Sequence, residues 1–293
     1  MTTATDLPFE LVEEILIASA WSSLKQAAVL ARVSRFIYEL IKPVLFRTTV
    51  YGGLKNAWPC TDVKWNWLEI NGGYVRNLLF SDNDACTTEV EIALETCPNL
   101  INIAIWMDPF EVDIPSFLKP LSLLRPHRLS MDLNCLFVGP FQEEHAQLPM
   151  FAHLTHLEMA GGCYDWDCMQ GIQYLPRLTH LSVPRDLDED MDMVLIIQNY
   201  AFAHCSHLAV VVLFSSLSND TNETGEVVVE APLPSAIQES VDPRIVSLGC
   251  EYSKDWVLGA QGGRDMWVVA EEIVERRQST RNKSDGVHLS EVL

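Results

Sequence analysis

The sequence predicts a mixed α/β fold, in which a short helical unit precedes an irregular repeat solenoid with a parallel sheet. Two observations predict it. The first fifty residues carry three short amphipathic helical patterns. The rest of the chain repeats the apolar spacing L-x-x-L-x-L, followed three positions later by a small or polar residue, at intervals of about 25 residues. Short strands that alternate with helices are typical of a parallel sheet.

The first three helices are predicted from their caps and apolar stripes. Asp6-Leu7-Pro8 opens the first helix, because proline suits the first helical position. Ser22-Ser23 and Ser34 are expected to cap the second and third helices. Pro43 is expected to end the third, since proline disfavours helical geometry in the residue before it. Three helices this short form only a marginal core.

Several motifs in residues 6–50 resemble the F-box, particularly as it occurs in large families of fungal F-box proteins. They are Leu7-Pro8-x-Glu10-Leu11, Ile15-Leu16, Val33-Ser34-Arg35 and Pro43-Val44-Leu45-Phe46-Arg47. The family often has tryptophan shortly after the Val-Ser-Arg triplet, where this chain offers Phe36 and Tyr38. The alternative is that these helices only cap the domain that follows.

The resemblance implies that this chain docks on a Skp-type adaptor and, through it, on the cullin of a ubiquitin ligase. The positions that match the adaptor-binding residues of the family are Leu7, Pro8, Leu11, Ile15, Leu16 and Val33. The chain would then be the non-catalytic, substrate-recognition subunit of that ligase.

The body of the chain contains seven matches to the repeat spacing. Their anchor residues are Leu78, Ile103, Leu129, Leu157, Leu181, Val211 and Leu248, at intervals of 25, 26, 28, 24, 30 and 37 residues. The first four intervals fall in the range of leucine-rich repeats. The pattern from about Val75 to Ser253 resembles the irregular leucine-rich-like repeats that follow many F-boxes, and a repeat domain is predicted over residues 51–262. A plain α/β domain with a parallel sheet is the alternative.

Two features are predicted for the end of the chain. Residues 263–278 have apolar residues on one face and should form a helix that covers the end of the repeats. Residues 279–293 are polar and are expected to form a disordered tail. Before them, residues 219–240 read as a long loop with a hairpin strand at 227–229.

Composition and motifs exclude several functions. The net charge of −20 opposes sequence-independent binding to nucleic acid or anionic lipid. No signal peptide or membrane-length apolar run is readable, so a cytoplasmic or nuclear protein is expected. No phosphate-binding loop, nucleophile elbow, zinc module or cofactor motif was found. The remaining alternatives to a ligase subunit are an interaction scaffold and, less favoured, an unrecognised hydrolase.

The repeat spacing also predicts a substrate-binding face. Residues next to the anchors point away from the core, which places Arg128, His156 and His180 in a row on adjacent strands. Trp106 and Phe214 would flank this row as aromatic anchors. Such a row of donors suits an acidic or phosphorylated segment of a substrate protein. The alternative is that these are ordinary surface residues.

Overall fold

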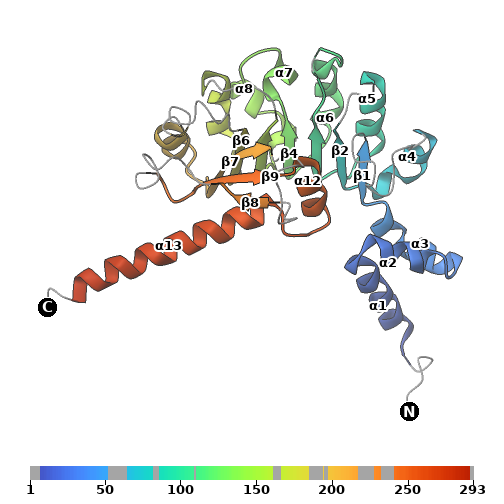
Figure 1. Cartoon of the computed structure of the whole chain (residues 1–293). Helices are drawn as coiled ribbons and strands as arrows, with labels where there is room; N and C mark the ends of the chain where they lie inside the picture. Colours follow the sequence, from blue (N-terminus) through green and yellow to red (C-terminus); the bar gives the residue numbers. More distant parts are fainter. Residues whose placement is uncertain are drawn as a thin grey trace.

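The computed structural model describes residues 7–51, 65–81, 86–108, 110–160, 166–184, 194, 197–216, 228–231 and 241–290. Within these ranges the protein is mixed α/β, with a nine-stranded sheet in the order β1-β2-β3-β4-β5-β6-β7-β9-β8 (Figure 1). All neighbouring strands in this sheet are parallel except β8 and β9. The mixed α/β class and the parallel sheet predicted from the sequence are therefore confirmed.

The strands are short. Their bounds are β1 Thr48–Tyr51, β2 Asn77–Phe80, β3 Asn102–Ile105, β4 Arg128–Met131, β5 His156–Met159, β6 His180–Pro184, β7 Val210–Ser216, β8 Val228–Glu230 and β9 Ile245–Cys250.

The α-helices connect the strands and form both ends of the chain. They are α1 Phe9–Ser22, α2 Leu24–Ala31, α3 Arg35–Leu45, α4 Trp65–Asn71, α5 Thr87–Thr96, α6 Leu118–Ser122, α7 Leu133–Phe137, α8 Glu143–Ala146, α10 Phe202–His204, α12 Tyr252–Ala260 and α13 Met266–Ser290. Tighter or wider helical turns complete the connections: η2 Gly72–Tyr74, η3 Ile114–Phe117, η4 Pro149–Phe151, η5 Trp166–Tyr174 and η6 Ile197–Ala201. Among the described helices, none has the length and apolar character needed to cross a membrane.

Helices α1 to α3 form a small unit beside the first strand (Figure 1). The predicted caps are present: the Ser23 hydroxyl accepts the Gln26 N–H at 3.0 Å, and the Ser34 hydroxyl accepts the Ile37 N–H at 3.2 Å. Pro43 does not end α3, which continues to Leu45. The last turn persists because its apolar residues Val44 and Leu45 are buried in the core of the unit. They pack there with Ala20, Ala27, Ile41 and Phe46.

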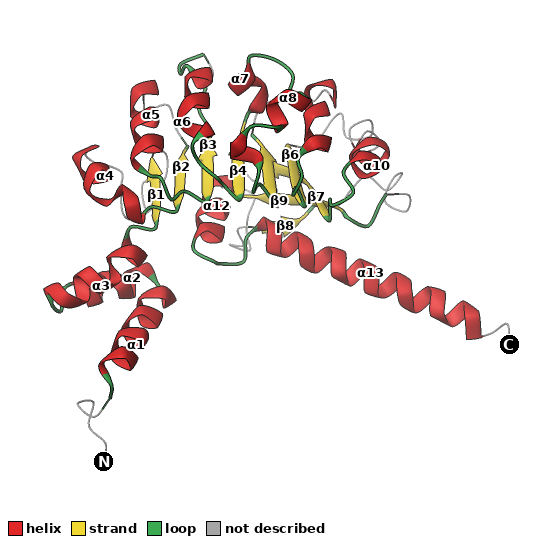
Figure 2. Ribbon diagram, turned by 180° about the vertical axis from the view of Figure 1, so that it is seen from behind, coloured by secondary structure: helices red, strands yellow, loops and turns green. Residues whose placement is uncertain are grey.

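The repeat frame predicted for β2 to β7 is confirmed by the strand register. Leu78, Ile103, Leu129, Leu157 and Leu181 lie opposite one another on consecutive strands. All five side chains are buried in the main core. That core lies between the sheet and the helices α4 to α8, which cover one face (Figure 2).

The predicted repeat spacing missed the strand at one end of the sheet and assigned the wrong anchor residue to β9 near the other end. Strand β1 begins within residues 6–50, which were assigned to the helical unit, and its Thr49 pairs with Leu78. Its threonines do not match an apolar spacing, so the search passed over it. At the other end Ile245, not Leu248, lies opposite Val211. These two anchor residues are 34 positions apart in the sequence. This interval is longer than those between the preceding anchors, so a fixed period could not predict where the last strand begins.

The C-terminal segment packs on the opposite face of the sheet. Helix α12 covers β1 to β3, where Val50, Leu79 and Ala104 contact Trp256 and Val257. The first three turns of α13 cover β7 and β9 (Figures 1 and 2). The helix predicted over 263–278 is present, but it continues to Ser290, where a disordered tail was expected. Polar composition indicates solvent exposure, and it does not by itself prevent a helix from forming.

The predicted hairpin strand is found at β8, which pairs antiparallel with β9. Most of the rest of the expected loop, residues 219–227 and 232–240, lies outside the described residues.

Candidate functional site

Exposed apolar side chains are concentrated on the N-terminal helical unit. Of the six residues predicted to bind an adaptor, the exposed ones are Leu7, Pro8, Leu11, Ile15 and Val33, and Leu16 is half-buried. Ile15 exposes 56% of its surface and Val33 exposes 65%. Leu11 and Ile15 are four residues apart, which places them on one side of α1, and Leu7 lies just before the helix. Large apolar side chains gathered on the surface of a soluble protein commonly mark a binding site.

Two aromatic residues join this surface. The rings of Phe9 and Phe36 lie 5.4 Å apart and bring the starts of α1 and α3 together. Both side chains are about half exposed. The sequence analysis noted Phe36 only as a replacement for tryptophan and did not single out Phe9. The apolar docking surface is defined here as Leu7, Phe9, Leu11, Ile15, Val33 and Phe36.

The predicted row of polar side chains forms on the face of the sheet opposite helices α4 to α8. Arg128, His156 and His180 lie opposite one another on β4, β5 and β6. The two imidazole rings stack in parallel, with their centroids 4.1 Å apart. The prediction that these three side chains share one face is therefore confirmed.

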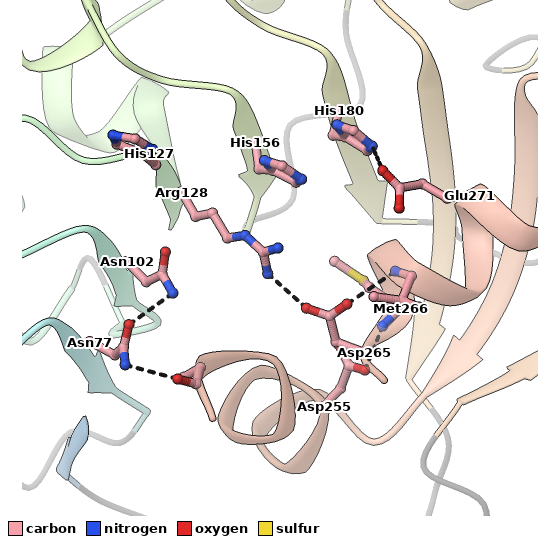
Figure 3. Close-up of polar contacts among 12 residues, drawn as sticks. Asn77, Asn102, His127, Arg128, His156, His180, Asp255, Asp265, Met266 and Glu271 are labelled. Atoms are coloured by element: carbon pink, nitrogen blue, oxygen red, sulfur yellow. Dashed lines mark hydrogen bonds and ion pairs between the residues drawn. The ribbon is translucent and has the colours of Figure 1, made fainter. Parts of the chain in front are cut away.

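That face is not exposed, because the chain's own C-terminal segment covers it. Arg128 donates from Nη1 to Oδ2 of Asp265 at 2.7 Å, and His180 Nε2 lies 3.0 Å from Oε1 of Glu271 (Figure 3). Trp267 packs edge-on against both imidazoles, with centroid distances of 5.2 Å to His156 and 5.6 Å to His180.

The flanking aromatic residues are also engaged within the chain. The ring of Tyr252, at the start of α12, lies 4.7 Å from that of Trp106 and 4.6 Å from that of Phe214. Trp106 also donates its indole N–H to the Ser130 hydroxyl at 2.6 Å. The expectation that Trp106, Arg128, His156, His180 and Phe214 form an open substrate-binding surface is therefore wrong.

A small cavity of about 20 Å³ remains between the strands and the covering helices. This volume is enough for about one water molecule. The cavity is lined by Asn102, Ile103, Arg128, Leu129, Ser130, His156, Glu158, Asp255, Trp256, Ala260, Asp265, Met266 and Trp267. Within the described residues, no group of three or more histidine, cysteine or acidic side chains is placed to hold a metal ion.

The buried carboxyl groups of Glu158, Asp255 and Asp265 line this cavity together with the guanidinium of Arg128. Burial raises the pKa of Glu158 to about 7, against the opposing hydrogen bonds from the Tyr252 and Ser130 hydroxyls. Burial and the neighbouring carboxylates of Asp265 and Glu158 raise the pKa of Asp255 to about 8. The two carboxyls thus bind protons that they would release in the unfolded chain near neutral pH.

The stability of the fold should consequently fall as the pH rises from 6.5 to 8. Glu158 and Asp255 have ordinary pKa values of 4.5 and 3.8, so folding becomes less favourable as the pH rises from there to their folded values. Burial lowers the pKa of His156 to about 2, and that of His180 also falls. The histidines therefore destabilise the fold only at pH values below 6.5, which is their ordinary pKa.

The variant Glu158→Gln tests this linkage. An amide cannot ionise, so the variant should gain stability relative to the wild type by up to roughly 1 kcal/mol per pH unit between pH 5 and 7. Urea unfolding at several pH values measures the effect. The exposed Glu144→Gln is the matched control and should follow the wild type throughout. Parallel curves for Glu158→Gln and the wild type would contradict the account.

The chain matches no family model, and no curated protein matches it. The functional assignment therefore depends on the motifs of the sequence and on the surfaces described above.

Proposed function

We propose that this chain is the substrate-recognition subunit of a Skp, cullin and F-box ubiquitin ligase. In this proposal residues 6–50 dock on a Skp-type adaptor, and the repeat body carries the substrate protein. The observation that carries the proposal is the apolar docking surface, whose residues include four of the six positions that match the adaptor-binding motif of the F-box, namely Leu7, Leu11, Ile15 and Val33.

The energetics of the helical unit favour a partner for this surface. Full burial of a leucine, isoleucine, valine or phenylalanine side chain contributes about 1.5–3 kcal/mol. Among the described residues, the core of the unit contains only six buried apolar residues, and two of them are the small residues Ala20 and Ala27. A partner that covers the apolar docking surface would therefore supply burial that the unit cannot provide for itself.

The unit is held on the body by contacts that leave the docking surface free. Phe46 packs edge-on against Trp67 of α4 at 4.8 Å, and the Lys42 ammonium lies 5.3 Å from the ring of Tyr74. The start of α1 lies at the end of the unit away from the sheet (Figure 1). This arrangement suits a module that binds one protein at its tip while the body binds another.

The body supports the proposal through its repeating construction. Strands β1 to β7 lie in chain order and are parallel, and the anchor residues of β2 to β6 recur at 24 to 28 residues. We interpret it as an irregular leucine-rich-like solenoid, an architecture whose extended surfaces commonly bind proteins.

Two other functions make different predictions. An interaction scaffold outside a ligase would not bind the adaptor. A hydrolase would need a pocket that admits a substrate, and the cavity on the covered face has room for only about one water.

The direct test is co-elution of the full chain with a purified Skp-type adaptor in size-exclusion chromatography. We expect a complex at micromolar concentrations. Separate elution of the two proteins at these concentrations would favour the scaffold and overturn the ligase assignment.

A further inference from the structure

The amino-terminal ends of the parallel strands continue as a regular backbone ladder. The residue before each strand accepts or donates across to its neighbour: the Ile101 N–H donates to the Arg76 carbonyl at 2.8 Å, the His127 N–H to the Ile101 carbonyl at 2.8 Å, and the Thr155 N–H to the His127 carbonyl at 2.9 Å. The ladder continues to Ala209. Side chains at this edge therefore repeat at the spacing of the strands, roughly 4.8 Å.

Several exposed side chains along this edge, one or three residues before the strands, are cations and imidazoles. We define the amino-edge row as Arg76, Arg125, His127, His153, Arg177 and His207, all of which are exposed. The rings of His127 and His153 stack 6.2 Å apart, which shows that neighbouring repeats place these side chains together. Such a row is unexpected in a chain whose net charge is −20.

The opposite edge of the sheet carries acidic residues. Asp108, Glu111 and Asp113 follow β3, Asp132 follows β4, and Glu251 follows β9. The cations of the row and these acidic residues thus lie at opposite edges of the sheet. An acidic ligand would be repelled at the carboxyl edge and attracted at the amino edge.

Helix termini explain only part of this segregation. Cations near the C-terminus of a helix are stabilised by its carbonyls, and Arg125 indeed donates to the carbonyls of Ser122 and Leu124. Arg177 and His207, in contrast, form no ion pair with any other residue that the structure describes. Their donors are available to a ligand.

We propose that the amino-edge row is an interaction surface for an extended acidic segment of a protein partner. From Arg76 to His207 the row crosses five strand intervals, roughly 24 Å, which is the length of about seven extended residues. Carboxylates or phosphates along such a segment would lie within reach of several donors of the row.

The position of the row suits the proposed ligase subunit. Arg47, which follows α3 directly, belongs to the same ladder, because its carbonyl accepts the N–H groups of Arg76 and Asn77. The helical unit and the row therefore meet at one edge of the sheet. The identification of the acidic segment as part of a substrate rests on the proposed function, whereas binding itself is tested without the adaptor.

A nucleic acid is the less favoured ligand. Its phosphates would extend beyond the row toward a protein surface that is acidic overall, and the repulsion would grow with the length of the strand. A short acidic peptide meets the row alone.

Fluorescence anisotropy with the full chain at low ionic strength tests the proposal. The probes are labelled peptides of about nine residues in which glycine alternates with glutamate, phosphoserine or glutamine, and a thymidine oligonucleotide of the same length. We expect both acidic peptides to bind, and the glutamine peptide to bind at least tenfold more weakly. Tighter binding of one acidic peptide would tell whether carboxylate or phosphate is preferred.

The variant Arg177→Glu with His207→Glu should weaken binding of the acidic peptides at least tenfold. Its control is Lys25→Glu with Lys254→Glu, which changes the net charge at least as much on exposed residues away from the row. If the first variant does not fold, Arg177→Gln with His207→Gln replaces it. Equal binding by the row variant and the wild type, equal binding of the glutamine peptide, or preferential binding of the oligonucleotide would each overturn the proposal. Adaptor binding by the same preparations tests the proposed function separately.

Discussion

Replacing Leu157 with alanine is expected to destabilise the repeat body by about 2–5 kcal/mol. Leu157 is fully buried, and its neighbours in register, Leu129 and Leu181, are buried as well. Truncation removes apolar burial and leaves a cavity in a core that runs continuously from repeat to repeat. Urea unfolding followed by circular dichroism measures the change.

The matched control is Leu123→Ala, because Leu123 lies in the same body and exposes 74% of its surface. A surface substitution of this kind usually changes the stability by less than about 0.5 kcal/mol. Similar unfolding curves for the two variants would show that Leu157 does not belong to a continuous core.

The second large effect is expected at the helical unit. Leu7→Ala combined with Pro8→Ala should weaken binding to a Skp-type adaptor by about a hundredfold or more, because a few apolar anchors carry most of the energy of an interface. Both residues are exposed, so the melting temperature of the body should not change. Titration calorimetry measures the affinity, and a thermal melt measures the stability.

The control for this variant is Leu123→Ala with Pro140→Ala, which removes the same two residue types from exposed positions on the body. It should bind the adaptor as the wild type does. Adaptor binding that survives the change of Leu7 and Pro8 would contradict the assignment of this surface.

The period of the sequence was sufficient to predict most of the sheet. Leu78 to Leu181 were placed correctly, because a buried side chain at a fixed interval constrains both the strand and its register. Where the interval varied or the inward residues were polar, as at Thr49 and Ile245, the pattern gave no such constraint. These strands are held in place by their neighbours.

The residues of the covered face were predicted, but their environment was not. Alternation along a strand shows which side chains share a face, and it does not show which segment packs there. The Arg128–Asp265 pair joins residues 137 positions apart, and no local pattern links them. One available signal was the unbroken apolar run from Val210 to Phe214, which is typical of a strand buried on both faces.

The burial of Glu158 and Asp255 follows from the same packing. As sequence these are single acidic residues in a chain with 40 of them. Only their burial between the sheet and the C-terminal segment, Glu158 on β5 and Asp255 on α12, distinguishes them from the solvated acidic residues.

Hydrogen exchange of the full chain with and without a purified Skp-type adaptor tests the central claim most directly. We expect the adaptor to slow exchange in α1 to α3, while the amides of β3 to β6 exchange at unchanged rates. Unchanged exchange in α1 to α3 at saturating adaptor, or protection confined to the repeat body, would contradict it.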